Sequence, residues 1–301
     1  MIYGQLLSGG EGRIRTYVAE AADLQSAGIN HSPTSPFQDS YFYSRMELSQ
    51  HIFFMTQAFD EEKILQGLDL SRLDLVLYNT TTSTNDVGKE MPLNKEFLVI
   101  SSDIQTKGRG RESKKWHSPS GNVCFSITFI EKDPNIPISL ITGVIAQIAI
   151  TNALNAKNIQ LKWPNDLIYK NKKIGGILVE KEIEGSYIKT IVGIGINLDL
   201  DKKEPWWGDL SKFSNSKTRD LILNNLIKGF FGFVDGKLIN WMDAWNKNCC
   251  HMNKIINIKN NNKIIENGEF IGISAKGALL LKKDNTIKEY SFGEISIEGI
   301  Y

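Results

Sequence analysis

A regular alternation of hydrophobic and polar residues begins at Leu73. Leu73, Leu75 and Leu77 share one side of an extended chain, and residues 123–129 alternate in the same way, as expected of strands with one buried face. Between them, residues 97–100 are apolar at every position, which is typical of a central strand covered on both sides. The pattern therefore predicts a sheet that begins near residue 73.

Helical spacing replaces this alternation after Pro137, a favourable first-turn residue. Isoleucines recur at helical spacing from residue 138 to residue 148, so we predict a helix over 137–156 that packs on the sheet. The pattern further predicts strands at 159–163, 173–181 and 187–199, the first two linked by a turn at 171–172, and helices at 217–231 and 236–248. From about residue 252, short β-type runs separated by turns indicate a small barrel of roughly 50 residues.

Residues 1 to about 45 follow neither period and end in a turn-rich run at 31–36. Back-translation of residues 12–16 and 23–26 can reproduce the antisense of a transfer RNA T-loop and of a tyrosine anticodon arm. One hypothesis is that a tRNA gene is translated in error and that the true start is Met46 or Met55. The alternative is a disordered leader.

We therefore expect a leader over 1–72, a catalytic domain over 73–250 and a C-terminal barrel over 251–301. The 301 residues are 41% hydrophobic, which is enough for one large core and a smaller one. The formal net charge of +1 provides no global attraction for nucleic acid or an anionic membrane.

The three cysteines lack the spacing of a disulfide framework or a zinc site. Residues 249–251, Cys-Cys-His, are either a metal corner or buried core thiols, and the metal content stays unknown. No apolar run approaches the roughly 20 residues that span a bilayer, and the N-terminus lacks signal-peptide order. We expect a cytoplasmic protein with no membrane association.

A loop after the second predicted strand alternates glycine with arginine at residues 108–111. Glycines let backbone amides approach an anion, and the guanidinium groups of Arg109 and Arg111 can bind phosphate or carboxylate oxygens. Trp116 lies five residues further on, where an indole can stack on an adenine ring. Most short Gly-Arg runs, taken alone, are solvated loops or nucleic-acid contacts, and a lone tryptophan such as Trp116 is more often a core residue.

A second motif, Lys-Trp-Pro-Asn-Asp, occupies residues 162–166 at the end of a predicted strand. Ile159, Leu161 and Trp163 share one face of that strand, so Lys162 points to the opposite side, where it can neutralise two anions. An exposed lysine is the other interpretation.

A third motif is a strand face that carries few side chains, formed by Gly193, Gly195 and Asn197, with Gly175 and Gly176 on a neighbouring strand. A ligand can lie directly on such a backbone, although glycines in strands also mark bulges or close packing. A fourth motif, residues 80–86, can cap a short helix beginning near Asn85 or bind a small polar head group such as a ureido ring.

Taken together, these motifs resemble the biotin protein ligase family in identity, order and spacing, from about Leu73 to Tyr301. The resemblance implies an α/β (α+β) catalytic domain on a mixed sheet, followed by an SH3-like barrel. It implies activation of biotin with ATP, assisted by Mg2+, to biotinyl-5'-AMP. The biotinyl group would then pass to a lysine of a biotin carboxyl carrier protein, such as that of acetyl-CoA carboxylase.

The resemblance also implies roles for individual residues. Lys162, Arg109 and Arg111 would be catalytic. The biotin site would comprise Ser83, Thr84, Asn85, Gln105, Arg109 (backbone and side chain), Gly110, Arg111, Lys162, Gly176 and Gly195. The ATP site would comprise Arg111, Trp116, Lys162, Asn165 and Asn197.

Two departures limit the resemblance. Some family members carry a DNA-binding winged helix, but residues 1–72 show no helix-turn-helix pattern, so no DNA partner is expected. The loop is also less basic after Arg111 than is frequent in the family.

The alternative functions are those of a lipoate or octanoyl transferase and of an RNA-binding module. The sequence leaves open whether a homodimer forms.

Overall fold

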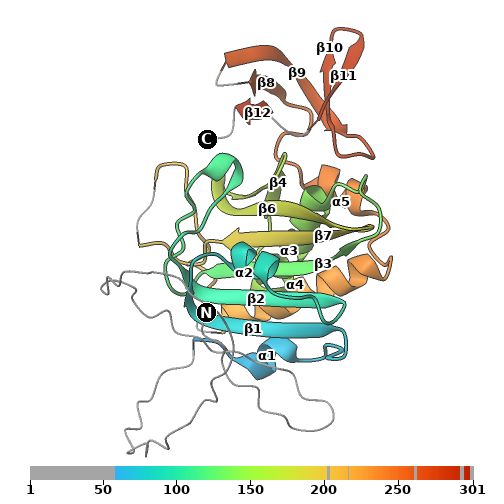
Figure 1. Ribbon diagram of the computed structural model, residues 1–301. Coiled ribbons are helices and arrows are strands. Elements are labelled where there is room, and N and C mark those ends of the chain that lie inside the picture. Colours follow the sequence, from blue (N-terminus) through green and yellow to red (C-terminus); the bar gives the residue numbers. More distant parts are fainter. Residues whose placement is uncertain (1–57, 202–203, 216, 261–262, 292–294, 299–301) are drawn as a thin grey trace, which may run out of the picture.

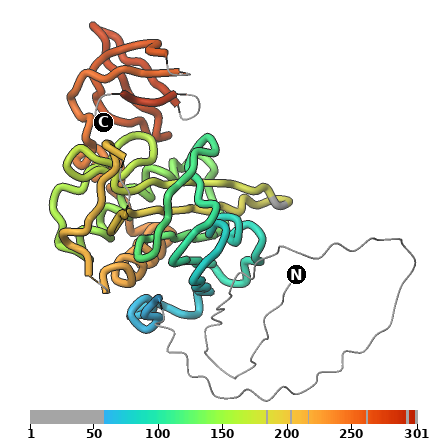
Figure 2. Tube along the Cα trace, turned by 90° about the vertical axis from the view of Figure 1, so that its left-hand side faces the viewer, coloured from blue at the N-terminus to red at the C-terminus, as the bar shows by residue number. Residues whose placement is uncertain are grey.

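A computed structural model describes residues 58–201, 204–215, 217–260, 263–291 and 295–298 (Figure 1). The hypotheses on residues 1–45 and on a start at Met46 or Met55 lie outside these residues. The described chain forms a large α/β unit and, beyond residue 250, a smaller β unit that sits at one end of it (Figures 1 and 2). This arrangement confirms the predicted fold class.

The large unit is built on a seven-stranded sheet in the order β1-β2-β3-β7-β6-β5-β4. Its strands are β1 (Leu73–Thr81), β2 (Phe97–Gln105), β3 (Val123–Glu131), β4 (Gln160–Lys162), β5 (Asp166–Tyr169), β6 (Lys172–Glu184) and β7 (Tyr187–Ile196). Strands β1 and β2 are parallel, and every other neighbouring pair is antiparallel. The sheet is therefore mixed, as the resemblance implied.

Helices cover both faces of this sheet. On one face, α3 (Ile138–Leu154) packs against α4 (Thr218–Val234) and α5 (Trp241–Asn248) over the main core. On the other face, the short α2 (Thr84–Glu90) covers a small cluster that includes Val76, Leu98 and Ile100. The alternation at 73–77 predicted one buried face for β1, but α2 buries Val76 on the second face as well.

The packed structure extends N-terminal to Leu73, where the sequence placed the start of the catalytic domain. Helix α1 (Glu61–Leu65) contacts α4, and its Ile64 is fully buried. Asn224 Nδ2 donates to the carbonyls of Ile64 and Gln66 at 2.8 and 2.9 Å, which satisfies the end of this short helix. Residues 58–72 therefore belong to the core rather than to a leader.

The region after Lys162 differs from the predicted connection. The strand β5 lies between β4 and β6, and the turn at Lys170 and Asn171, both with positive φ, joins β5 to β6. Leu167 and Ile168 are both completely buried, so this four-residue strand shows no alternation that could reveal it.

The small unit is a five-stranded antiparallel sheet in the order β11-β10-β9-β8-β12. Its strands are β8 (Ile255–Asn260), β9 (Lys263–Ile273), β10 (Leu279–Lys283), β11 (Thr286–Tyr290) and β12 (Ile295–Glu298). It is joined to the large unit by Trp163 Nε1, which donates to the Gly277 carbonyl at 3.0 Å, and by Trp245, whose ring lies 6.2 Å from that of Phe270.

Cys249 and Cys250 are buried free thiols, and burial raises the pKa of Cys249 to about 12. Their burial favours the core-thiol interpretation, and within the described ranges no group of three His, Cys, Asp or Glu side chains is placed to hold a metal ion. No helix in the described part of the chain is long and apolar enough to cross a membrane.

Candidate active site

A cavity of about 330 Å3 opens beside the glycine-rich ends of β6 and β7. All thirteen residues predicted for the site line it: Ser83, Thr84, Asn85, Gln105, Arg109, Gly110, Arg111, Trp116, Lys162, Asn165, Gly176, Gly195 and Asn197. Motifs that are up to 114 residues apart in the sequence thus meet at one place in the fold.

One end of the cavity, here called the head-group end, is a network of short polar side chains. Gln105 Oε1 accepts hydrogen bonds from the Thr84 amide at 2.9 Å and from the Thr84 hydroxyl at 3.2 Å. Ser126 Oγ, which sequence reasoning missed, lies 2.7 Å from Thr84 Oγ1 and donates to Asn85 Oδ1 at 2.6 Å. Ser83 occupies the N-cap of α2, but its side chain makes no capping hydrogen bond.

Asn85 is held in a single orientation. It is 4% exposed, and its Nδ2 donates to Glu180 Oε2 at 2.7 Å while its Oδ1 accepts from Ser126. The amide lies directly against Gly193, where a Cβ would collide with it. The absence of a side chain at Gly193 therefore makes room for Asn85 rather than for a ligand.

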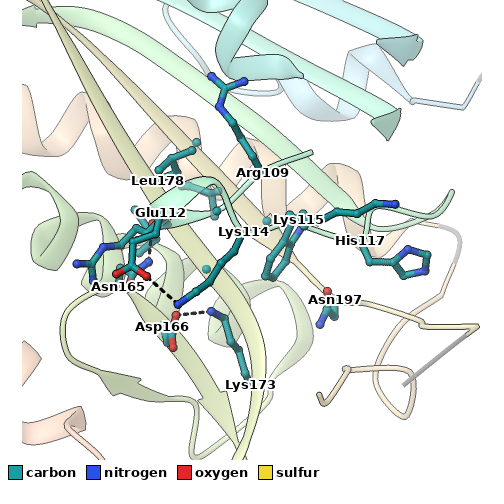
Figure 3. A pocket seen from close by; sticks show the side chains of 18 of the residues that line it. Arg109, Glu112, Lys114, Lys115, His117, Asn165, Asp166, Lys173, Leu178 and Asn197 are labelled. Atoms are coloured by element: carbon teal, nitrogen blue, oxygen red, sulfur yellow. Dashed lines mark hydrogen bonds and ion pairs between the residues drawn. The ribbon is translucent and has the colours of Figure 1, made fainter. Parts of the chain in front are cut away.

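The side chain of Arg109 is paired with two carboxylates of the protein. Its guanidinium donates to Asp86 Oδ2 at 2.7 Å and lies 3.2 Å from both oxygens of Glu180. Figure 3 shows this side chain directed away from Asp166 and Lys173 at the opposite side of the cavity. Arg109 lines the cavity, and its charge is balanced within the protein by Asp86 and Glu180.

The Gly-Arg loop, residues 105–116, is closed by backbone hydrogen bonds. The Gly110 amide donates to the Lys114 carbonyl at 2.7 Å, and the Trp116 amide donates to the Gly108 carbonyl at 2.9 Å. At its tip, Glu112 and Ser113 have φ values of 56° and 57°, a conformation that non-glycine residues adopt at some cost. The two ends of the loop are thus held together by its own hydrogen bonds, beside the cavity.

The indole of Trp116 lies on the bare strand face predicted from the glycine pattern. A Cβ on Gly195 would come within 2.5 Å of the indole, and one on Gly176 within 3.5 Å. Lys173 Nζ lies 5.7 Å from the ring centroid. These two glycines, here called the glycine floor, allow a flat ring to lie on the sheet.

Lys162 is 8% exposed at the end of β4, opposite Asp166 of β5. Burial lowers the pKa of Lys162 below its ordinary value, and the charge of Asp166 opposes this shift. Asp166 is itself paired with Lys173 at 2.6 Å (Figure 3). Because burial makes the Lys162 ammonium costly to charge, an anionic ligand beside it would stabilise its charged form.

Two asparagines complete the predicted set. Asn165 Nδ2 donates to the Ile177 carbonyl at 2.8 Å, and Asn197 Nδ2 donates to the Gly208 carbonyl at 3.0 Å. Both bonds tie the cavity wall to neighbouring backbone.

Sequence reasoning missed several other lining residues. Asp166 lies in the Lys-Trp-Pro-Asn-Asp motif but was not predicted as a site residue. The consecutive tryptophans at 206 and 207 also line the cavity, and this unusual pair could have indicated it. His117 stacks on Trp207 with ring centroids 6.1 Å apart. Residues 295–297 of the small unit also reach the cavity, which no local pattern could reveal.

The fold combines an α/β unit that carries most of the cavity with a small β unit, and comparisons with known proteins match both units. Residues 77–197 match the family model described as biotin/lipoate A/B protein ligase, and residues 251–297 match the biotin protein ligase C-terminal domain. Together these ranges cover more than half of the chain. The chain therefore belongs to the biotin protein ligase family, as the resemblance implied.

Curated relatives include the bifunctional ligase/repressor BirA of Escherichia coli, 31% identical over 215 residues that cover 65% of this chain and 65% of the relative. The biotin--protein ligase 2 of Arabidopsis thaliana is 34% identical over 173 residues, covering 51% of this chain and 50% of the relative. The chain thus spans less than two thirds of the length of these relatives.

Among solved structures, the biotin protein ligase from Aquifex aeolicus in complex with biotin and ATP is 25% identical and has a TM-score of 0.62. The match covers 74% of this chain and 98% of that structure.

Proposed function

We propose that this protein is a biotin protein ligase. It activates biotin with ATP to biotinyl-5'-AMP and pyrophosphate, and then transfers the biotinyl group to a specific lysine of a biotin carboxyl carrier protein. One observation carries the proposal: the head-group end, the Gly-Arg loop, Lys162 and the glycine floor line a single cavity. The related structure from Aquifex aeolicus, a complex with biotin and ATP, supports the same assignment.

The head-group end suits the polar ring of biotin. Thr84, Asn85 and Gln105 present hydroxyl and amide groups whose orientations are held by mutual hydrogen bonds, so little entropy is lost when a ligand binds. Trp116, whose indole lies on the glycine floor, provides a flat apolar ring suited to stacking on adenine.

Adenylation requires a carboxylate to approach a phosphate of like charge. Lys162 lies in the cavity wall, and its buried ammonium can neutralise both groups while negative charge builds on the bridging oxygen. Arg111, also in the wall, can bind the phosphates. The low-dielectric surroundings that make Lys162 costly to charge also strengthen its interaction with an anion.

The mixed anhydride that forms must be kept from water until the acceptor arrives. The closed Gly-Arg loop lies beside the cavity and can exclude solvent. The acceptor lysine then attacks the acyl carbon, its nitrogen forms the amide, and AMP leaves with the bond electrons.

Mg2+ would enter with ATP and share the charge of the departing pyrophosphate. This ion commonly binds one or two carboxylates together with substrate phosphates, and Glu112 and Asp166 are the carboxylates of the cavity wall that fit this requirement.

We place the enzyme in the cytoplasm, where its buried cysteines remain reduced. The carrier of a biotin-dependent carboxylase is the proposed acceptor, and a relative from Paracoccus denitrificans is named biotin--[acetyl-CoA-carboxylase] ligase. That relative is 32% identical over 100 residues, covering 31% of this chain and 41% of its own.

The decisive experiment is ATP–pyrophosphate exchange with purified protein. Exchange that depends on biotin, and not on lipoate, supports the proposal, followed by labelling of a carrier protein. Exchange with lipoate alone would assign the chain to the lipoate branch of the family model. Absence of exchange, with salt-dependent RNA binding, would favour the RNA-binding alternative.

A further inference from the structure

One carboxylate of β6, Glu180, contacts both the head-group end and the stem of the Gly-Arg loop. Its Oε2 accepts from Asn85 Nδ2 at 2.7 Å and its Oε1 accepts from Lys89 Nζ at 2.6 Å. Arg109 Nη2 lies 3.2 Å from both oxygens. A single side chain therefore holds a residue of the biotin site and a residue of the loop.

The loop has a second anchor on the same helix as Asn85. Asp86 of α2 forms a two-point ion pair with the guanidinium of Arg109, at 2.5 and 2.7 Å. Hydrogen bonding to Arg109 lowers the pKa of Asp86. Two carboxylates, Asp86 and Glu180, thus balance the two cations, Arg109 and Lys89.

The network of Asp86, Lys89, Arg109 and Glu180 is partly buried, so water screens its charges less than it screens fully exposed ones. The side chains of Glu180 and Arg109 are 22% and 27% exposed. Burial alone would raise the pKa of Glu180, but the hydrogen bonds from Lys89 and Asn85 and the charge of Arg109 hold it below its ordinary value. Glu180 is therefore ionised at neutral pH and accepts charge-assisted hydrogen bonds, which are stronger than neutral ones.

We propose that Glu180 is a positioning residue that couples biotin binding to closure of the Gly-Arg loop. It orients Asn85 toward the head group and, through Arg109, holds the loop stem beside the cavity. The inference rests on the proposed function, since biotin is the ligand assigned to this end. Because such coupling is reciprocal, biotin stabilises the closed loop and the closed loop strengthens biotin binding.

The variant Glu180→Gln keeps the size of the side chain and removes its charge. The amide nitrogen of the new glutamine is a donor and would face the donors of Lys89 or Arg109. Two donors cannot form a hydrogen bond with each other, so part of the network must break. Loss of a hydrogen bond to a charged group predicts biotin binding weakened roughly ten- to hundredfold. Glu182, two residues further along the same face of β6, provides the matched control Glu182→Gln.

Three measurements test the inference on the full chain: biotin affinity by calorimetry without ATP, melting temperature, and tryptic cleavage after Lys114 and Lys115 with and without biotin. In the wild type and in Glu182→Gln, biotin should slow this cleavage. In Glu180→Gln, affinity should fall and the protection should be lost. If Glu180→Gln matches Glu182→Gln while the wild type binds biotin and is protected, the inference is overturned.

A second variant separates coupling from general loss of structure. Asp86→Asn weakens one anchor of Arg109 and leaves the contact between Asn85 and Glu180, so loop cleavage should rise while biotin affinity falls less than in Glu180→Gln. Equal loss of biotin affinity in both variants would also overturn the role of Glu180. A wild type that binds no biotin would instead refute the proposed function, and this inference with it.

Discussion

The indole of Trp116 lies against the backbone of Gly195, so closely that a methyl group on Gly195 would approach the indole nitrogen to 2.5 Å. A ring that stacks on a strand backbone needs a residue without a side chain beneath it. The same ring is farther from Gly176, where an added Cβ would make an ordinary contact at 3.5 Å. The two glycines of the floor thus differ in how much they constrain the tryptophan.

This difference predicts graded effects of alanine at the two positions. Gly195→Ala should displace Trp116 and raise the KM for ATP roughly ten- to hundredfold, since overpacking of this kind costs about 1–3 kcal/mol. Gly176→Ala should change it by only a fewfold. Steady-state exchange kinetics at saturating biotin measure both values, and equal effects of the two variants would argue against stacking on Gly195.

Lys162 should be needed for adenylation more than for biotin binding. Its charge matters most as the anhydride forms, so Lys162→Ala should lower the exchange rate about 100- to 1,000-fold while biotin affinity stays within a fewfold. Its melting temperature should not fall, because a buried ammonium is removed. Exchange activity within about tenfold of the wild type would exclude this role.

The lowered pKa of Lys162 also predicts an effect of pH. Burial favours the neutral amine, so in the free enzyme the Lys162 ammonium loses its proton at a pH below 10.5, the pKa of an ordinary lysine. The value of kcat/KM for ATP should therefore fall on the alkaline side at a pH below that value. Bound anions favour the ammonium, so kcat should fall at a higher pH. Coincident alkaline limbs in the two profiles would contradict this assignment.

Local patterns were sufficient to predict many of the residues of the site but few of the contacts between them. The alternation at 73–77 and 123–129 and the helical spacing after Pro137 identified β1, β3 and α3, because each places a long stripe of side chains in one core. The motifs themselves identified all the predicted lining residues.

What the sequence could not reveal depends on contacts between distant segments. The Arg109 guanidinium meets Glu180, 71 residues away, and nothing in the local sequence indicates this pairing. Residues 58–72 show no periodicity because only isolated side chains such as Phe59 and Ile64 are buried there. The boundary at Leu73 was therefore placed too late.

The junction of the two units predicts a loss of stability on substitution of Trp163. Its indole donates to the Gly277 carbonyl at 3.0 Å and is 1% exposed. Trp163→Phe leaves that carbonyl without this donor, at a cost of about 1–3 kcal/mol, and the melting temperature should fall by several degrees. Trp241→Phe, at a half-buried position of α5, is the control and should melt closer to the wild type. Equal melting temperatures for the two variants would show that the bond contributes little.

The last prediction concerns retention of the adenylate by Arg109. Because its guanidinium binds Asp86 and Glu180, Arg109→Gly should release the stem of the Gly-Arg loop. Lys162 and Arg111 would remain in the cavity wall, so synthesis of biotinyl-AMP should fall less than its retention. The reactive anhydride would then escape and modify lysines on unrelated proteins.

Incubation of Arg109→Gly with ATP, biotin and albumin, followed by a blot for biotin, measures this escape. Labelling of albumin should exceed that of the wild type several-fold at equal rates of adenylate synthesis. The control is Lys107→Gly, which gives the same loop an additional glycine but removes an exposed side chain. If only Arg109→Gly leaks, the ion pairs of Arg109 retain the adenylate. If both variants leak equally, loop flexibility alone explains the escape, and if neither does, retention depends on other residues.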